Sequence, residues 1–125
     1  MGIVMESTSS SVQQKCFEDF SVGDTATWTR KFTRGDIDTY ADLLGDHNPV
    51  HFDESFAKKM GFRGCLVPGM MTAGLVVALA GMNLPGAGAI LAHCFFEWKK
   101  PVYIDDEVTV RITVAEKRKG GRMGR

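Results

Sequence analysis

At positions 45–53 the chain reads Gly45-Asp46-His47-Asn48-Pro49-Val50-His51-Phe52-Asp53, and the rest of the sequence is organised around this stretch. Asn48-Pro49 excludes a continuing helix, because proline lacks an N–H group and pushes the preceding residue out of the α region. We therefore expect a turn, and turns on a rigid scaffold often carry chemistry. A turn can place Asp46 beside His51. A carboxylate next to an imidazole can share the proton transfers of a reaction on water.

The segments before this turn predict a strand and then a helix. Residues 25–31 are rich in threonine and contain a tryptophan, a composition that favours a strand. Thr33, followed three residues later by Asp36, resembles a capping box at a helix start. One apolar helical face follows, at spacings of three and four residues, formed by Ile37, Tyr40, Ala41 and Leu44. Gly45 is a natural helix end, so we expect the helix to stop one residue before Asp46.

After the turn, Asp53 can cap a short helix over residues 54–60, which Gly61 would end. Pro68-Gly69 then opens a predicted helix over residues 70–82. This second helix is apolar nearly all round, which is typical of a buried helix. A buried helix in a chain of this length needs a sheet wrapped around it.

Two further segments predict strands of that sheet. Residues 89–98 alternate well enough for a long strand, with Ile90, Phe96 and Trp98 on one side. Residues 107–116 alternate more regularly, with β-branched residues at every second position. Together with the helices, these strands predict an α+β fold.

The pattern Gly-Asp-x-Asn-Pro-x-His-x-Asp over residues 45–53 resembles the signature of the MaoC-like, (R)-specific enoyl-thioester hydratases. The resemblance continues through Val67-Pro68-Gly69-Met70, Leu84-Pro85-Gly86 and Pro101-Val102 to about residue 116. It implies a hot-dog fold, an antiparallel sheet wrapped around a buried central helix. It also implies hydration of trans-2-enoyl thioesters, or the reverse dehydration of (3R)-hydroxyacyl thioesters, in fatty acid metabolism.

The resemblance also assigns roles to individual residues. Asp46 would hold and deprotonate the water, and His51 would share that water and deliver the proton at Cα. The backbone N–H of Gly69 would bind the thioester carbonyl oxygen, which suits the start of a helix and a residue without a side chain. Asn48 would fix the turn. The substrate would be an acyl-CoA or acyl-carrier-protein thioester, and the protein would be a homodimer.

No metal and no redox cofactor are expected. Asp46, His47, His51 and Asp53 are all metal-ligand types, but Pro49 prevents the two histidines from lying one helical turn apart. Two other functions remain as alternatives: a non-catalytic acyl-thioester-binding domain, and a hot-dog thioesterase.

Some features depart from the family pattern. Pro68 stands where a histidine usually precedes the helix glycine, and Val77 stands where a serine is frequent. Both positions bear on how a thioester is seated. Family members also continue past residue 116 with strands that complete the sheet. Residues 120–125 do not resemble them, so we expect the C-terminal strands to be absent and part of the central helix to be uncovered.

Composition and charge bound the remaining classes. We expect a disordered segment over residues 1–16, the domain over 17–116 and a basic, disordered tail over 117–125. This tail holds five of the 15 basic residues and no acid, so residues 1–116 carry 10 basic and 15 acidic groups. Such a body is not a nucleic-acid surface. The three cysteines are widely spaced, which favours reduced thiols in a cytoplasmic or mitochondrial protein. No apolar run is long enough to span a bilayer.

Overall fold

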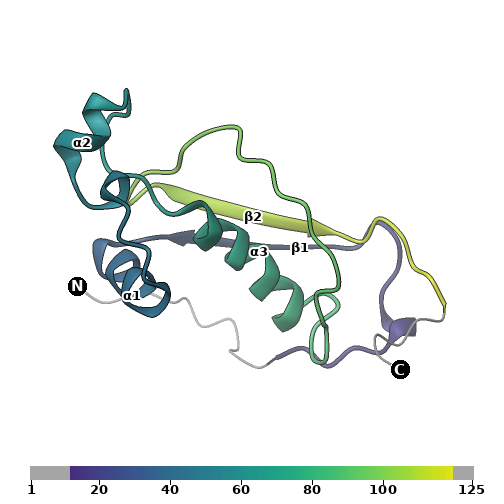
Figure 1. Cartoon of the computed structure of the whole chain (residues 1–125). Coiled ribbons are helices and arrows are strands. Elements are labelled where there is room, and N and C mark those ends of the chain that lie inside the picture. Colours follow the sequence, from purple (N-terminus) through teal and green to yellow (C-terminus); the bar gives the residue numbers. More distant parts are fainter. Residues whose placement is uncertain (1–11, 120–125) are drawn as a thin grey trace.

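The computed structural model describes residues 12–119 and has an α+β architecture (Figure 1). A short 3-10 turn (η1, Phe17–Asp19) precedes the first strand. The other elements, in chain order, are β1 (Thr25–Lys31), α1 (Arg34–Leu44), η2 (Pro49–His51), α2 (Glu54–Lys59), α3 (Gly69–Met82) and β2 (Glu107–Thr113). The predicted strand over 25–31 and the three predicted helices are therefore present, with ends that differ by one residue at most.

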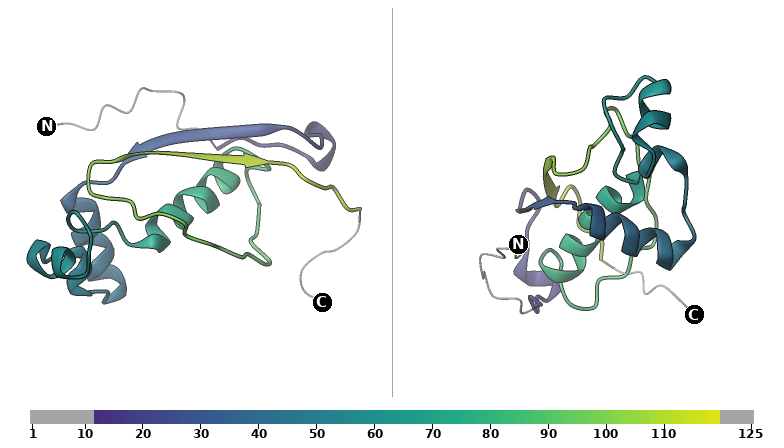
Figure 2. Two further views of the ribbon diagram at one scale, coloured as in Figure 1. Left: turned by 90° about the horizontal axis from the view of Figure 1, so that it is seen from above. Right: turned by 90° about the vertical axis from the view of Figure 1, so that its left-hand side faces the viewer.

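The sheet consists of β1 and β2, which pair antiparallel from Thr25 opposite Thr113 to Lys31 opposite Glu107. α3 lies along one face of this pair (Figure 2). Alternate residues of each strand point toward the helix. The core forms where they meet α3 and the start of α1, and its buried members are Phe32, Ile37, Val67, Leu75, Leu79 and Val110.

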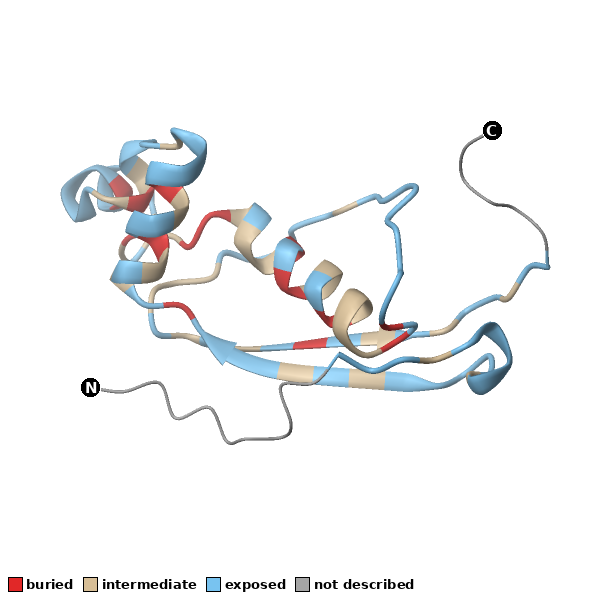
Figure 3. Ribbon diagram, turned by 90° about the horizontal axis from the view of Figure 1, so that it is seen from below, coloured by how far each residue is buried: buried red, intermediate tan, exposed pale blue. Residues whose placement is uncertain are grey.

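The α3 helix is buried on one side only, which corrects the expectation of a fully buried helix. Ala73, Leu75 and Leu79 are buried, whereas Gly74 and Ala78 are exposed (Figure 3). The physical reason is the size of the sheet, because two strands can cover only one face of a helix. Within residues 12–119 the other face has no sheet against it.

The predicted strand over residues 89–98 is wrong. The chain there belongs to neither strand of the described residues and runs as an exposed loop from the end of α3 toward β2 (Figure 1). Ile90 is 74% exposed and Phe95 is 84% exposed. Alternation favours a strand only if a neighbouring strand satisfies its backbone groups. We name residues 89–99 the crossing segment.

The chain ends are described in part. Gln13 donates a backbone hydrogen bond to Met82 O at the end of α3 and accepts one from Ala87 N in the turn that follows, each at 2.8 Å. β2 ends at Thr113, earlier than the predicted residue 116. The expectations for residues 1–11 and 120–125 lie outside the described residues. No helix within residues 12–119 is both long enough and apolar enough to cross a membrane.

Candidate active site

The turn over residues 45–53 begins where the sequence predicts. Gly45 ends α1 in the left-handed conformation, with φ of 75°, and its N–H donates to Ala41 O at 2.7 Å. This reversal brings Asp46 out of the helix axis and into the turn. Asp46 Oδ1 then accepts from the backbone N–H of Asn48 at 3.3 Å, which holds the carboxylate against its own loop.

Asn48 shapes the next part of the turn. Its Oδ1 accepts from the backbone N–H of Val50 at 3.3 Å and so caps the 3-10 turn η2 that carries His51. The side chain is exposed and accepts this hydrogen bond from the backbone. This geometry agrees with a part in fixing the turn.

His51 is the buried residue of the turn, only 9% exposed. Its Nδ1 lies 2.9 Å from the backbone carbonyl of Leu66. A carbonyl can only accept, so Nδ1 carries a proton and donates. The remaining ring nitrogen, Nε2, is thereby the one that can exchange protons with a ligand, and it faces Asp46.

Nε2 of His51 and Oδ2 of Asp46 are 3.9 Å apart. This distance is too long for a direct hydrogen bond. It suits one water molecule that bonds to both groups, as is common for polar atoms separated by more than 3.5 Å. The structure therefore brings the two predicted residues together across a gap of one small molecule.

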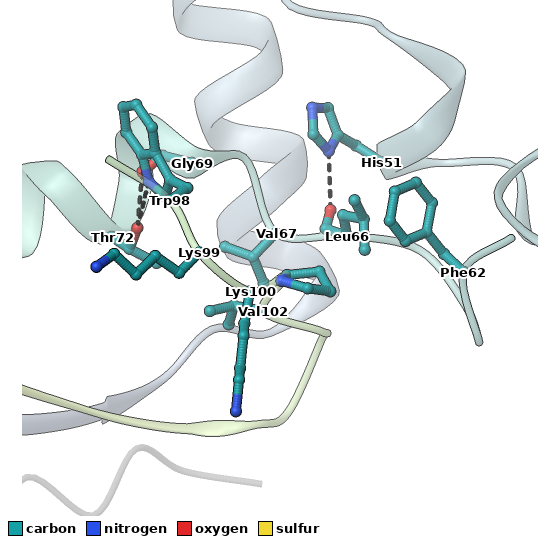
Figure 4. Close-up of a pocket in the computed structure, with 11 residues that line it drawn as sticks. His51, Phe62, Leu66, Val67, Gly69, Thr72, Trp98, Lys99, Lys100 and Val102 are labelled. Carbon is teal, nitrogen blue, oxygen red and sulfur yellow. Dashed lines mark hydrogen bonds between the residues drawn. The ribbon is translucent and has the colours of Figure 1, made fainter. Parts of the chain in front are cut away.

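A cavity of about 350 Å³ opens beside His51 and reaches the start of α3 (Figure 4). Its walls are mostly apolar, and its lining residues are His51, Phe62, Leu66, Val67, Gly69, Thr72, Trp98, Lys99, Lys100, Pro101 and Val102. His51 and Gly69 thus face one space. Asp46, whose side chain is 36% exposed, is not one of the described lining residues and reaches His51 from outside the cavity.

The start of α3 is covered by an indole that sequence reasoning missed. Trp98 Nε1 donates to Gly69 O at 3.1 Å and to Thr72 Oγ1 at 3.3 Å, and a Cβ on Gly69 would lie 3.0 Å from the ring. Thr72 Oγ1 also donates to Gly69 O at 2.7 Å. From the sequence we expect Trp98 only as an apolar strand residue, because its partners in α3 lie 26 and 29 positions away.

Tyr40 is a second residue that the sequence assigned only to the core face of α1. Its pKa is raised, first by desolvation and second by the negative charge of Asp46. The phenol therefore keeps its proton beside the Asp46 carboxylate. The sequence pattern places Tyr40 on the apolar face of α1 and does not indicate that it lies near the Asp46 carboxylate.

One known domain family covers most of the chain. The sequence pattern described as the MaoC like domain matches residues 20–124. The chain belongs to the MaoC-like domain family.

Individual MaoC-like relatives cover most of this chain. A 3-hydroxybutyryl-CoA dehydratase from Methylorubrum extorquens is 38% identical over 100 residues, which are 80% of this chain and 64% of that protein. A mitochondrial 3-hydroxyacyl-acyl-carrier-protein dehydratase from tomato, Solanum lycopersicum, is 38% identical over 91 residues, 73% of this chain and 54% of that protein. The chain therefore spans 64% of the length of the first relative and 54% of the length of the second.

A solved structure gives the fold of this MaoC-like chain. The (R)-hydratase from Aeromonas caviae involved in PHA biosynthesis superimposes with a TM-score of 0.78 at 34% identity, covering 82% of this chain and 77% of that chain. The hot-dog fold predicted from the sequence is confirmed, with β1, β2 and α3 as its described sheet and central helix.

The other two candidate residues of the turn over residues 45–53, Asp53 and His47, have a capping position and a surface position. Asp53 Oδ1 accepts from Phe56 N at 2.9 Å and so caps α2. His47 is exposed. Within residues 12–119, no three His, Cys, Asp or Glu side chains gather closely enough to hold a metal ion.

Proposed function

We propose that this MaoC-like chain catalyses the (R)-specific hydration of trans-2-enoyl thioesters, or the reverse dehydration of (3R)-hydroxyacyl thioesters. One observation carries the proposal: a carboxylate and an imidazole nitrogen stand 3.9 Å apart, beside a cavity that leads to the start of a helix. The names of the two reported relatives, both dehydratases of 3-hydroxyacyl thioesters, support the same reaction.

The reaction needs a base for water and an acid for Cα. In the proposed hydration, a water bound between Asp46 and His51 attacks Cβ and loses a proton to Asp46. Nε2 of His51, protonated before the step so that the ring is an imidazolium, delivers its proton to Cα on the same face and leaves the ring neutral. The proton taken up by Asp46 then returns to Nε2 through a second water molecule, which restores both groups. Because Nδ1 stays bonded to the Leu66 carbonyl, the ring keeps one orientation through both steps. Groups held in this way accelerate proton transfer by about 10² to 10⁴-fold.

The negative charge that builds on the thioester oxygen needs donors. Gly69 is the first residue of α3, and the N–H groups of a first helical turn have no partner within the helix. They also carry the positive end of the helix dipole. We assign the backbone N–H of Gly69 to the carbonyl oxygen, as a preorganised donor of the oxyanion-hole type.

The proposed substrate carrier is CoA or an acyl carrier protein, since the two reported dehydratases are named for one of each. The proposed assembly is a homodimer, and the exposed apolar side chains of the crossing segment, such as Ile90 and Phe95, offer surface for it. The proposed compartment is the cytoplasm or the mitochondrion, and the tomato relative is named as mitochondrial.

The test is hydration of crotonyl-CoA, followed by loss of the enoyl absorbance and by the chirality of the product. His51→Asn keeps a donor for Leu66 O but removes Nε2, and Asp46→Asn keeps the shape of the side chain. We expect each variant to lose at least about 100-fold in kcat. The double variant should lose little more than one single variant, because the pair acts as a unit.

His47→Asn is the matched control, because it changes an exposed imidazole of the same turn. It should retain wild-type kcat. Binding of crotonyl-CoA without turnover by the wild type would favour the non-catalytic binding domain. Release of free CoA thiol would favour the thioesterase. Either result would contradict the hydratase assignment.

A further inference from the structure

We propose that Arg34 is a positioning residue that sets His51 against Asp46. The inference rests on the proposed function. Arg34 is the first residue of α1, far in sequence from the turn, and the sequence pattern of the turn does not include it. It acts on the reaction through His51 and not through the substrate.

The contact of Arg34 with the turn is direct. Its Nη1 donates to the backbone carbonyl of His51 at 2.5 Å, and its guanidinium carbon lies 5.4 Å from the centre of the Phe52 ring. Phe52 in turn meets the His51 imidazole edge-on, with ring centres 6.4 Å apart. One guanidinium thus holds both the backbone of His51 and the aromatic ring against its side chain. Such planar, forked donors suit this double contact better than a lysine does.

Helix α1 connects Arg34 to both catalytic candidates, Asp46 and His51. Asp46 follows the C-terminal end of α1, whereas Arg34 begins the same helix. His51 is therefore joined to α1 at two points: through the chain that leads back to Asp46, and through the guanidinium of Arg34. With Nδ1 held by Leu66 and the carbonyl held by Arg34, the ring presents Nε2 in one position.

The charge of Arg34 has no carboxylate partner within 4.0 Å among the residues described, 12–119. Arg34 instead donates its hydrogen bond to a backbone carbonyl, whereas a surface arginine commonly pairs with a carboxylate. Other cationic side chains of the chain do pair in this way, such as Arg30 with Asp36 at 3.4 Å. This difference in partners points to a role in the turn.

Arg34 also lines a second cavity, of about 250 Å³, whose other lining residues are Glu54, Arg63, Gly64, Cys65, Tyr103 and Ile104. None of these residues lines the cavity beside His51. The Arg34 side chain is thus reachable by a small cation that does not enter the substrate cavity. Truncation of Arg34 would enlarge this second cavity by the volume of a guanidinium group.

The test uses Arg34→Ala with crotonyl-CoA as substrate. We expect kcat to fall about 10- to 100-fold, since a small misplacement of a reacting group costs that much. KM should change by less than about threefold, because Arg34 lies outside the substrate cavity. Millimolar guanidinium chloride should restore kcat about tenfold by refilling the vacated site. Arg34→Lys should keep part of the activity, because one donor remains.

Arg30→Ala is the matched control. Arg30 also contacts an aromatic ring, with its guanidinium carbon 5.5 Å from the centre of Phe32, and it also lies near the start of α1. Its side chain contacts Asp36 and Phe32 and forms no hydrogen bond or ion pair with the turn among the described residues, so kcat should be unchanged and guanidinium should have no effect. An Arg34→Ala variant with wild-type kcat, a change in KM alone, or an equal loss without rescue in both variants would overturn the proposal.

A second measurement separates this inference from the proposed function. The exchange rate of the His51 Nδ1 proton, observed by NMR in ¹⁵N-histidine protein, reports the ring position without any substrate. We expect exchange to be at least about tenfold faster in Arg34→Ala than in Arg30→Ala. Equal rates overturn the positioning role. A wild type that hydrates no enoyl thioester while this difference holds would reject the hydratase function only.

Discussion

The turn over residues 45–53 and the crossing segment over residues 89–99 both lie outside the regular helices and strands, yet they differ in how they are held. The turn closes on itself through backbone and side-chain hydrogen bonds at Asp46, Asn48 and Pro49, and it buries His51. The crossing segment is exposed along nearly all its length and is fastened mainly by the Trp98 indole.

The turn and the crossing segment therefore have different roles in the proposed active site. The rigid turn holds the groups that would move protons, for which small errors of position are costly. The loosely held segment supplies one wall of the cavity through Trp98 and Lys99. The two regions meet at Gly69, where the indole lies against the start of α3. Substitutions at or near this meeting point test the comparison most directly.

Gly69→Ala should have the largest effect. The new Cβ would stand 3.0 Å from the indole, so the ring must move by a few tenths of an ångström beside the backbone N–H proposed to bind the thioester oxygen. We expect a loss of about 10- to 100-fold in kcat/KM for crotonyl-CoA. Overpacking costs about 1–3 kcal/mol, part of which is offset by the helix preference of alanine. Activity and chemical denaturation measure the two effects.

Gly74→Ala is the control for this change. It lies in the same helix, and a Cβ there meets nothing within 4 Å. We expect the unfolding free energy to rise by about 0.5–1 kcal/mol with activity retained. Equal losses of activity in both variants would show that the helix backbone, and not the meeting with Trp98, controls the site.

Trp98→Phe should have a smaller effect. Phenylalanine keeps an aromatic wall but has no N–H to donate to Gly69 O and Thr72 Oγ1. Because Trp98 is 50% exposed, we expect the free energy of unfolding to fall by an amount near the lower end of about 0.5–1.5 kcal/mol. Amide hydrogen exchange should become faster in residues 89–99 and stay unchanged in the turn.

Trp28→Phe provides the comparison, because Trp28 packs against the core from β1. It should lower the global unfolding free energy without selective loosening of the crossing segment. If Trp98→Phe leaves exchange in residues 89–99 unchanged, the indole is not what fastens that segment.

The smallest expected effect concerns Asp106, which anchors the chain after the crossing segment. The backbone N–H of Tyr103 holds the pKa of the Asp106 carboxyl below its usual value, and the Arg63 guanidinium adds to this effect. A lowered folded-state pKa stabilises the protein above the unfolded value of about 3.9. The stabilisation is lost as the pH falls through the folded-state pKa.

Asp106→Asn should therefore reduce the steepness with which stability falls in acid, as measured by thermal unfolding between neutral pH and pH about 3. The effect should be small, since the side chain is 37% exposed and its ion pair with Arg63 is screened by solvent. Asp42→Asn, on the exposed face of α1, controls for the loss of one surface charge. Parallel acid profiles for the two variants would contradict the assignment.

The sequence predicted the parts of the fold that depend on near neighbours. Thr33 and Asp36 form the expected capping box, and Gly45 ends α1 where expected, so the approach of Asp46 to His51 followed from local signals. Gly69 at the start of α3 followed in the same way.

The failures all depend on contacts between distant segments. Residues 89–98 alternate like a strand, but alternation does not reveal whether a partner strand lies beside them. The apolar surface of α3 does not reveal how many strands cover it. Arg34 and Trp98 reach the site only because the folded chain brings separate segments together.

The bond from His51 to Leu66 uses a main-chain oxygen, and that choice has a consequence for sequence variation. Every amino acid supplies the same carbonyl, so exchange of the residue at position 66 leaves the imidazole in its tautomer. The Leu66 side chain meanwhile forms part of the cavity wall. Position 66 is thus a place where evolution, or a protein engineer, can reshape the room for the acyl group while the proton chemistry stays as it is.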